Sequence, residues 1–495
     1  FCGLNDPRNV IPSIGYAKQA GMIAQASLCI THSPVHTVEY YIGLAKQFIE
    51  AGADEICLKD MAGIGRPVSL GKIVKGIKEY APQIPIQYHS HSGPGFSMAS
   101  ILEVCENGCD YVDVGMSPLS WGTGHADVIA VQEMLKDAGF QVKDINMEAY
   151  MQARTLIQEM LDDFLGYYCP SLNRIDNSLL IKPGLPGGMM GSLMTDLEEN
   201  LSSLNKWKEK HGQKPLTTDE LLVKLFDEVA YVWPKVGFPP LVTPFSQYVK
   251  NLSLMNVVSM EKGKNRWEMF PDTIWDMVLG KAGKLPSEVD DEIKALAAAQ
   301  GRQFISTDPQ ENYPDCLDEF RAKMKANGWE TGQDDEELFE YAMHPVQYEA
   351  YKSGKAKADF EADLAKRKAE KNAPKGAALP ESIIVNLNGA SYKLDISYDG
   401  TAPAASATAA PVSNSDAEDV PAPISGKFLL TQDGSETPRK VGDHVKRGDV
   451  LCYIEAMKIN NAICADFDGT VTAILAHNGD TVEEDDVIVK MTRDK

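Results

Sequence analysis

The sequence is short of positive charge. Its 48 lysines and arginines face 71 aspartates and glutamates, which gives a formal net charge of −23. Nucleic acid and anionic membrane surfaces repel a chain this acidic, so we expect neither as a partner. The chain also lacks any apolar run near the ~18 residues that a membrane-spanning helix needs. We therefore expect a protein that crosses no membrane, although a partner could hold it at the inner face of one.

Cysteine patterns of disulfide frameworks and zinc sites are also missing. The nine cysteines are odd in number, scattered through apolar segments, and form no Cys-x-x-Cys pair. This usage is typical of a reducing compartment and predicts a cytoplasmic protein. Residue 1 is phenylalanine, and nothing like a signal peptide precedes the first predicted helix. A length of 495 residues corresponds to about three domains.

An internal repeat occupies residues 421–495. Gly426 corresponds to Gly469, and the Gly-Asp-His-Val sequence at 442–445 corresponds to Gly-Asp-Thr-Val at 479–482. Short apolar runs separated by Gly-Asp turns predict strands, so two similar halves would form a small flattened β-barrel. Lys458 lies between the halves, where a turn would project its amine into water.

With Ala-Met-Lys at 456–458 as its marker, this segment resembles the biotinyl domain of biotin-dependent carboxylases. The resemblance implies that a biotin protein ligase links biotin to Lys458 through an amide, with Met457 beside it. The lipoyl domain shares this fold, but it usually has Asp-Lys-Ala or Asp-Lys-Val at the turn. It also lacks the longer segment that this chain has at 431–440. The sequence therefore favours biotin over lipoate.

Strands and helices alternate from residue 1 to about residue 135. Apolar strands are predicted at 24–30, 55–59, 84–89 and 111–115. Between them run amphipathic helices, one of which places Tyr41, Leu44, Ala45, Phe48 and Ile49 on a single face. Such units imply parallel strands covered by helices, and four of them make half of an eight-fold α/β barrel.

Three candidate site residues stand at the predicted carboxyl ends of strands, where such barrels carry functional side chains. Lys59 ends the second strand, and His89 and His91 end the third. Residues two apart on a strand face the same way, so both imidazoles can reach one Zn²⁺, Co²⁺ or Mn²⁺ ion. Lys59 can join only as a carbamate formed with CO₂, because an ammonium has no lone pair. A hydrogen-bonded histidine pair without a metal is the alternative.

Lys-Asp-Met-Ala-Gly at 59–63, followed by His-Ser-His at 89–91, closely resembles the carboxyltransferase domain of the biotin-dependent enzymes. Pyruvate carboxylase, the oxaloacetate decarboxylase α subunit and the transcarboxylase 5S subunit share this domain. The resemblance implies a (β/α)8 TIM barrel in which carbamylated Lys59 holds a divalent metal with His89 and His91. It also implies that the first strands of the barrel, with an aspartate ligand and a substrate-binding arginine, are absent from residues 1–495.

The chain departs from the family pattern at several positions. Relatives generally have acids where this chain has Cys2 and Ser92. Their proton-shuttling threonine follows a Pro-Gly-Gly loop, which here occupies 186–188 and leads to a hydroxyl shifted by one residue. The resemblance implies that another hydroxyl takes the place of this threonine, and we expect it to be that of Ser192, with Thr195 as the alternative.

The remaining segments differ in composition. Residues 136–305 are mostly helical in pattern, 306–399 combine charged helices with a hairpin, and 400–420 are rich in alanine and proline. The resemblance implies that the first of them is a helical extension that completes the active site. We interpret the second as an inter-subunit region of a homo-oligomer and the third as a flexible tether. The predicted domains are thus 1–135, 136–305, 306–399, 400–420 and 421–495.

The resemblance implies carboxyl transfer between oxaloacetate or pyruvate and covalent biotin. Nothing in the chain resembles an ATP-dependent biotin carboxylase, so a partner must perform the second half-reaction. If sodium-pumping membrane subunits do so, the chain is the α subunit of oxaloacetate decarboxylase, which is our prediction. If a biotin carboxylase subunit does so, the chain is the B subunit of a two-subunit pyruvate carboxylase.

Three further alternatives remain open. A transcarboxylase usually keeps its biotinyl domain on a separate chain. A non-catalytic biotin-carrier scaffold would agree with the departure at Cys2 and with Gly191, which stands where the family has its threonine. A metal-dependent lyase of the same barrel superfamily, such as hydroxymethylglutaryl-CoA lyase, shares the His-x-His motif but has no biotinyl domain.

Overall fold

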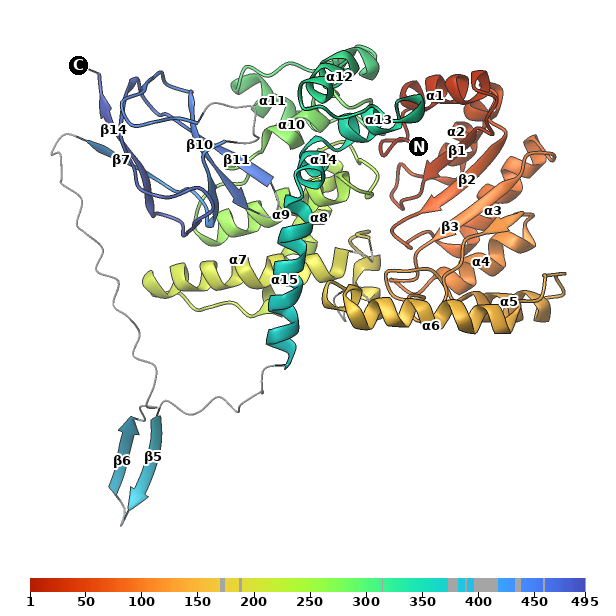
Figure 1. The fold of residues 1–495 in the computed structure, drawn as a ribbon, viewed down its shortest axis with the longest axis horizontal. Coiled ribbons are helices and arrows are strands. Elements are labelled where there is room, and N and C mark those ends of the chain that lie inside the picture. Colours follow the sequence, from red (N-terminus) through yellow and green to blue (C-terminus); the bar gives the residue numbers. More distant parts are fainter. Residues whose placement is uncertain are drawn as a thin grey trace. The chain divides into compact units, whose positions relative to one another are not determined.

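The computed structural model describes most of the chain, and the statements below concern that part. The described residues are 1–169, 174–186, 189–313, 315–372, 382–387, 390–395, 417–431, 438–456 and 459–494. They form two compact units, one of Phe1–Asp315 with Asp419–Lys495 and one of Cys316–Glu418 (Figure 1). Within the described residues, no helix is long and apolar enough to span a bilayer.

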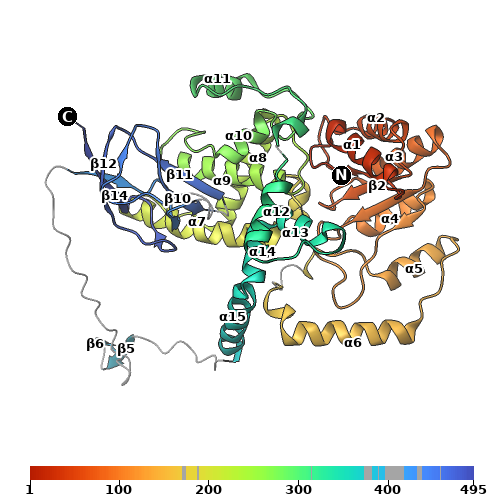
Figure 2. The same ribbon diagram turned by 45° about the horizontal axis from the view of Figure 1, so that its top comes forward.

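A parallel four-stranded sheet begins the first unit. Its strands follow one another in the order β1 (Gln25–Cys29), β2 (Glu55–Asp60), β3 (Ile86–Ser90) and β4 (Tyr111–Val112). The helices of this part are α1 (Pro7–Gln19), α2 (Val38–Glu50), α3 (Pro67–Tyr80), α4 (Ser97–Glu106) and α5 (Val128–Asp137). Parallel neighbours in sequence order, joined by helices, are what a segment of a (β/α)8 barrel requires. Figures 1 and 2 show α2, α3 and α4 lying alongside these strands.

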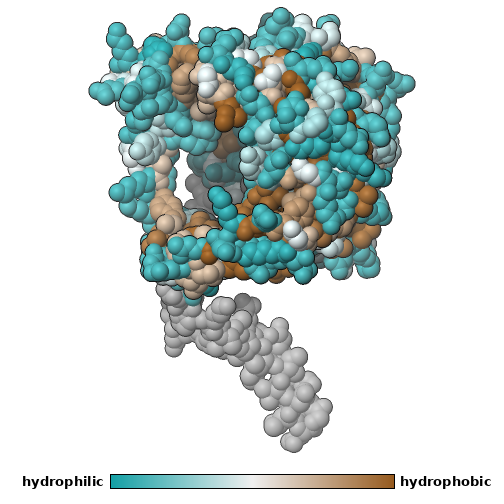
Figure 3. All heavy atoms as spheres, turned by 90° about the vertical axis from the view of Figure 1, so that its right-hand side faces the viewer, coloured by the Kyte–Doolittle hydropathy of each residue, from teal (hydrophilic) through white to brown (hydrophobic). Residues whose placement is uncertain are grey.

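The predicted amphipathic face of α2 lies in the core. Tyr41, Leu44, Ala45 and Phe48 are buried, and the Thr37 side chain accepts a hydrogen bond from the Tyr40 amide to cap the helix. The strand predicted at 111–115 is shorter than expected. After β4 the chain leaves the sheet, and Gly115 forms an isolated bridge with Asp127. The face of the molecule in Figure 3 is mainly hydrophilic, as the acidic composition leads us to expect.

Helices dominate the next part of the first unit. They are α6 (Met147–Asp163), α7 (Met190–Lys210), α8 (Thr218–Lys235), α9 (Phe245–Glu261), α10 (Asp272–Val278) and α11 (Asp291–Ala299), with short 3₁₀ turns η1 (Leu165–Tyr167), η3 (Ser178–Ile181) and η5 (Pro309–Asn312). Their core includes Leu225, Val232, Leu252 and Trp275, all fully buried. Leu4 belongs to this same core, so the first residues of the chain connect the sheet to the helices.

The C-terminal part of this unit is a small β-structure of two four-stranded sheets. One has the order β11-β10-β8-β13 and the other β7-β14-β12-β9. The strands are β7 (Glu418–Pro421), β8 (Gly426–Leu429), β9 (His444–Val445), β10 (Val450–Ala456), β11 (Ile459–Cys464), β12 (Gly469–Ile474), β13 (Thr481–Val482) and β14 (Val487–Arg493). The repeated glycines stand where backbones approach closely. A Cβ on Gly426 would lie 2.6 Å from the Glu455 carbonyl oxygen, and one on Gly469 would lie 2.4 Å from that of Thr492.

The second unit contains the charged helices and the hairpin that the sequence predicts. Its elements are α12 (Leu317–Ala326), η6 (Gln333–Asp335), α13 (Glu336–Met343), α14 (Pro345–Lys352), α15 (Lys355–Asn372), β5 (Ser382–Leu387) and β6 (Ala390–Asp395). A small core of Met324, Leu338, Tyr341 and Tyr348 holds α12, α13 and α14 together. The strands β5 and β6 are antiparallel neighbours. The tether predicted at 400–420 lies mostly outside the described residues, and its role stays a prediction.

Candidate metal centre

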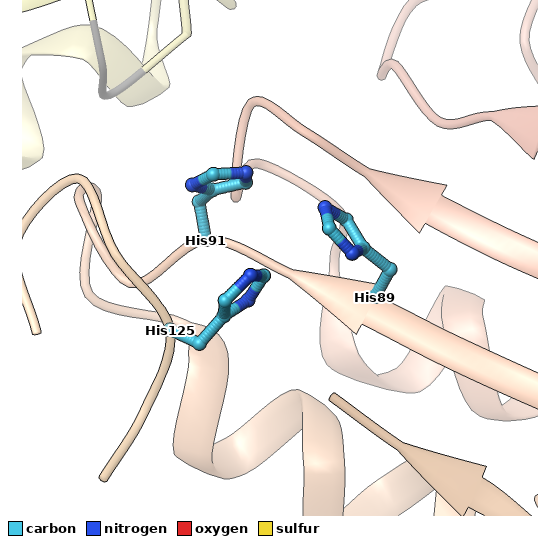
Figure 4. A group of neighbouring side chains, drawn as sticks. All are labelled: His89, His91 and His125. Atoms are coloured by element: carbon cyan, nitrogen blue, oxygen red, sulfur yellow. The ribbon is translucent and has the colours of Figure 1, made fainter. Parts of the chain in front are cut away.

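Three imidazoles meet at the carboxyl end of the parallel sheet. His89 lies on β3, His91 directly follows that strand, and His125 comes from the loop before α5. One ring nitrogen of each lies within 4.8 Å of those of the other two. The ring centroids are 4.6 Å apart for His89 and His125, and 5.2 Å apart for His89 and His91. Figure 4 shows the three rings around a common space.

The Nδ1 atom of each ring is held by an oxygen. His89 Nδ1 lies 2.7 Å from a carboxylate oxygen of Asp113, and His125 Nδ1 lies 2.7 Å from the Ser90 carbonyl. His91 Nδ1 contacts the carbonyl of Thr123. Carbonyl and carboxylate oxygens only accept, so a neutral ring carries its proton on Nδ1 and leaves a lone pair on Nε2. This pairing is the usual second layer of contacts around metal-binding histidines.

Burial keeps the rings of His89 and His91 neutral. It lowers the pKa of His89 to about 4. Lys59 and the other two imidazoles act in the same direction, whereas the hydrogen bond that Asp113 accepts from the ring raises the pKa. Burial likewise lowers the pKa of His91, again with the help of Lys59 and His125. Since only a neutral imidazole can bind a metal, both rings are competent ligands at neutral pH.

Lys59 lies on the neighbouring strand. It is the register partner of His89 across β2 and β3, and of Cys29 across β1 and β2. Register partners on parallel strands point to the same face, so its amine shares the face of the His89 ring. The Lys59 Nζ atom lies 5.4 Å from the centroid of the Phe1 ring. The structure thus brings Lys59, His89 and His91 together, as the sequence led us to expect, while their roles stay predictions.

Gly63 ends the Lys-Asp-Met-Ala-Gly motif, and the structure explains why this position needs a glycine. Gly63 has φ +66°, and a Cβ there would lie 2.3 Å from the carbonyl oxygen of His91. The Asp60 carbonyl accepts hydrogen bonds from the amides of Gly63 and His91, at 3.1 and 3.2 Å. The two motifs are therefore parts of one backbone arrangement, and any larger residue at 63 would push the His91 backbone away.

Sequence reasoning missed Asp113 and His125. Asp113 directly follows β4, and its second carboxylate oxygen accepts from the Gln87 side chain at 2.7 Å. Its place within the strand predicted at 111–115, next to the strand that carries His89, was a signal that could have found it. His125 lies on a loop without periodicity, so no pattern in the chain placed it near the other histidines.

Cys2 and Ser92, which depart from the family pattern, both take part in local hydrogen bonds. Ser92 is buried, and its hydroxyl bonds that of Ser97 at 3.1 Å. The Cys2 backbone carbonyl accepts a hydrogen bond from the Cys29 thiol. The sulfur of Cys2 accepts one from the side-chain amide of Asn9. None of these hydrogen bonds joins Cys2 or Ser92 to the three imidazoles.

The other predicted site residues are placed in part. Ser192 belongs to α7, but its side chain is outside the described part of the chain, and so are Met457 and Lys458. These two residues connect the paired ends of β10 and β11, where Ala456 and Ile459 are register partners. The structure therefore tests neither the catalytic hydroxyl nor the biotin attachment site.

Three family models match successive parts of the chain. An "HMGL-like" model matches residues 8–157, a "Conserved carboxylase domain" matches 181–394, and a "Biotin-requiring enzyme" model matches 418–491. Among solved structures, the carboxyl transferase domain of Rhizobium etli pyruvate carboxylase with pyruvate has a TM-score of 0.57 at 21% identity. It covers 80% of this chain and 68% of that one. Together with the three family models, this likeness establishes the fold, a TIM-barrel carboxyltransferase with a helical extension and a small all-β biotinyl domain.

Curated relatives are similar over most of the chain. The pyruvate carboxylase B subunit of Methanocaldococcus jannaschii is 30% identical over 466 residues, which cover 93% of this chain and 74% of the relative. The 5S subunit of methylmalonyl-CoA carboxyltransferase of Propionibacterium freudenreichii subsp. shermanii is 31% identical, over 70% of this chain and 64% of that one. The large subunit of 2-oxoglutarate carboxylase of Hydrogenobacter thermophilus is 27% identical over 94% of this chain and 74% of its own length.

Proposed function

This chain belongs to the family of biotin-dependent carboxyltransferases that contains the pyruvate carboxylase B subunit, and we propose that it acts as a subunit of that kind. In this role it would transfer a carboxyl group from covalent biotin to pyruvate, while a separate biotin carboxylase subunit reloads the biotin. The prediction of an oxaloacetate decarboxylase α subunit shares this chemistry, but the comparisons favour the alternative.

One observation carries the proposal. The similarity to the pyruvate carboxylase B subunit extends over 93% of this chain, through the barrel, the helical extension and the biotinyl domain. The similarity to the 5S subunit covers 70%. A carboxyltransferase and its biotin carrier on a single chain therefore agree better with a pyruvate carboxylase of two subunits than with a transcarboxylase. The match to a biotin-requiring model also argues against a lyase without biotin.

We assign metal binding to His89, His91 and His125, which each present a ring nitrogen to one space. Imidazole nitrogens suit Zn²⁺, Co²⁺ or Mn²⁺, and a bound ion of this kind would polarise the carbonyl of a 2-oxo acid. Asp113 holds the His89 ring by its Nδ1 atom, so that Nε2 stays turned to the shared space. Lys59, on the same face, is proposed to supply a further oxygen ligand as a carbamate.

Two roles remain, the attachment of biotin and the transfer of a proton. Lys458 is the proposed attachment point of biotin, which carries the carboxyl group once attached. When the new carbon–carbon bond forms at the methyl carbon of pyruvate, a methyl proton must move to the nitrogen that gives up the carboxyl group. The hydroxyl of Ser192, or that of Thr195 one turn further along α7, is the proposed carrier of that proton.

Reconstitution with a partner tests the function. The chain is mixed with a biotin carboxylase subunit, ATP, bicarbonate and pyruvate, and oxaloacetate is followed through NADH oxidation by malate dehydrogenase. We expect oxaloacetate only when both subunits are present. His125→Ala should abolish its formation, whereas His477→Ala, an exposed histidine of the biotinyl domain, should not. A parallel reaction with 2-oxoglutarate tests the substrate of the Hydrogenobacter relative.

Two results would contradict parts of this proposal. If the biotin carboxylase subunit supports no carboxylation of either 2-oxo acid, while sodium-pumping membrane subunits support decarboxylation of oxaloacetate, the decarboxylase prediction is restored. Oxaloacetate formation that persists in His125→Ala would remove the three-histidine site from the proposal but leave the function standing.

A further inference from the structure

A pocket lies at the same end of the sheet as the three histidines, and none of those histidines lines it. It has a volume of about 190 Å³ and is bounded by the loop after β1 and the loop after β2. The polar side chains that line it include Thr31, His36, Arg66 and Ser69. No aspartate or glutamate is among the described residues that line it, in a chain with a net charge of −23.

His36 offers this pocket a proton donor. The Ser33 hydroxyl oxygen accepts hydrogen bonds from the amides of Val35 and His36, so its own proton is free to go to His36 Nδ1, 2.7 Å away. Burial lowers the pKa of His36 to about 3, so the ring is neutral and carries its proton on Nε2. In the described part of the chain this buried Nε2 has no hydrogen-bond partner.

Thr31 adds a second donor of the same kind. Its side chain is 3% exposed, and its hydroxyl has no partner among the described residues. Buried donors without partners are rare, because each forfeits its bond to water. Both residues line the same pocket, and each donor would gain a partner if its side chain turned toward an acceptor bound there.

Arg66 supplies the charge. Its guanidinium donates to the Ile64 carbonyl at 2.7 Å and lies 5.3 Å from the Phe96 ring centroid, so two contacts orient it. No carboxylate within ion-pair distance of it is present in the described chain. The nearby Asp60 carboxylate is occupied by the amides of Ile64 and Gly65, at 3.1 and 2.9 Å. Most of the guanidinium N–H groups therefore remain available to a ligand.

The helix that follows adds further donors. Arg66 is the N-cap of α3, and no side chain caps this helix. Pro67, the first helical residue, has no amide hydrogen, but the amides of Val68 and Ser69 lack partners within the helix, and Ser69 brings this helix end to the pocket. Helix N-termini attract anions through these free N–H groups and through the helix dipole.

We propose that this pocket binds a phosphate group. Each contribution described above can donate a hydrogen bond or carries a positive charge, and this favours an acceptor-rich anion as the ligand. The donors come from two loops and a helix end and approach from different directions. This arrangement matches the tetrahedral oxygens of phosphate better than the two coplanar oxygens of a carboxylate. The site is separate from the carboxyl-transfer chemistry, and the phosphate belongs either to the free ion or to a phosphate monoester.

Titration of the full chain with inorganic phosphate tests the proposal, followed by isothermal calorimetry and by ³¹P line broadening. We expect saturable binding at one site per chain. Arg66→Ala should weaken it at least about tenfold, the loss of a charge-assisted contact. Lys75→Ala is the matched control, because it removes the same charge from an exposed position of the same helix. It should leave the affinity within about twofold. Arg66→Lys, which keeps the charge without the planar fork, should fall between them.

Competing anions decide the chemical class and the source. Glycerol 3-phosphate that binds more tightly than inorganic phosphate identifies a monoester as the ligand, and weaker binding identifies the free ion. Acetate that displaces phosphate at equal concentration would overturn the phosphate assignment. Absence of saturable binding, or equal losses in Arg66→Ala and Lys75→Ala, would overturn the site itself. No carboxyl transfer is measured, so the result does not depend on the proposed function.

Discussion

Substitution of Asp113 should weaken metal binding although this residue is not a proposed ligand. Its carboxylate lies 2.7 Å from His89 Nδ1, and the two side chains are 32% and 17% exposed. Loss of such an orienting partner typically costs 10- to 100-fold in metal affinity, or about 1.4–2.7 kcal/mol. We expect a loss in this range for Asp113→Ala, which frees the ring. Asp113→Asn keeps an acceptor oxygen and loses the charge, so about three- to tenfold is expected.

The measurement is a competition between the protein and a chromophoric chelator for Zn²⁺, repeated with Co²⁺ and Mn²⁺. Asp110→Asn is the control, because that carboxylate contacts Lys78 and the Ile86 amide, both at 2.8 Å, and none of the three histidines. Circular dichroism of each variant verifies the fold. Unchanged affinity in Asp113→Ala, or an equal loss in Asp110→Asn, would refute the reasoning that this carboxylate acts by holding the His89 ring.

Three further predictions concern other parts of the chain. Lys458→Arg should abolish streptavidin labelling of the natively expressed protein, because biotin attachment needs the lysine amine. Lys427→Arg, on β8 of the same domain, should leave the labelling intact. Tyr41→Phe should cost about 1–3 kcal/mol in urea unfolding, since the buried hydroxyl accepts from the Thr31 amide at 2.8 Å and donates to the Cys29 carbonyl at 3.1 Å. Tyr80→Phe, whose exposed hydroxyl contacts Glu50, should stay within about 0.5 kcal/mol. Finally, burial raises the pKa of Asp60 from 3.8 to about 6, against hydrogen bonds from Gly65 and Ile64. A folded-state pKa above the unfolded one stabilises the protein at acid pH, and this contribution is lost as the pH rises through about 6. Relative to Asp60→Asn, the wild type should therefore lose about 2–3 kcal/mol between pH 4 and 7, as measured by urea unfolding at each pH.

Much of the fold could be predicted because its signals are local. The face of α2 follows the helical period, and the strands β1, β2 and β3 are apolar runs that end near the predicted residues. The short β4 was harder to predict. Its end depends on the pairing of Gly115 with Asp127, a contact that hydrophobicity does not encode.

The candidate site was predictable only where it follows a strand. Lys59, His89 and His91 share one sheet edge because their strands are parallel neighbours in register. His125 joins them through a loop whose course depends on tertiary bonds. Its Nδ1 atom bonds the Ser90 carbonyl, 35 positions earlier in the chain. No pattern in the sequence itself brings that residue to the other two histidines.

The state of Lys59 should control the metal centre. As an ammonium on the face of His89, this residue helps burial to lower the pKa of both His89 and His91, and the same positive charge opposes a divalent cation. As a carbamate it would carry a negative charge and attract the ion. In bicarbonate-free buffer we therefore expect Lys59→Met to bind Zn²⁺ more tightly than the wild type. Added bicarbonate should reverse the order by raising the affinity of the wild type at least about tenfold.

Lys72→Met, at an exposed position of α3, is the control and should respond to bicarbonate as the wild type does. The reversal separates the two roles of the amine, because a lysine that merely fills space would affect metal binding equally in both buffers. If bicarbonate leaves the Zn²⁺ affinity of the wild type unchanged, Lys59 is not a carbamate ligand. The three histidines would then have to hold the ion beside a permanent positive charge.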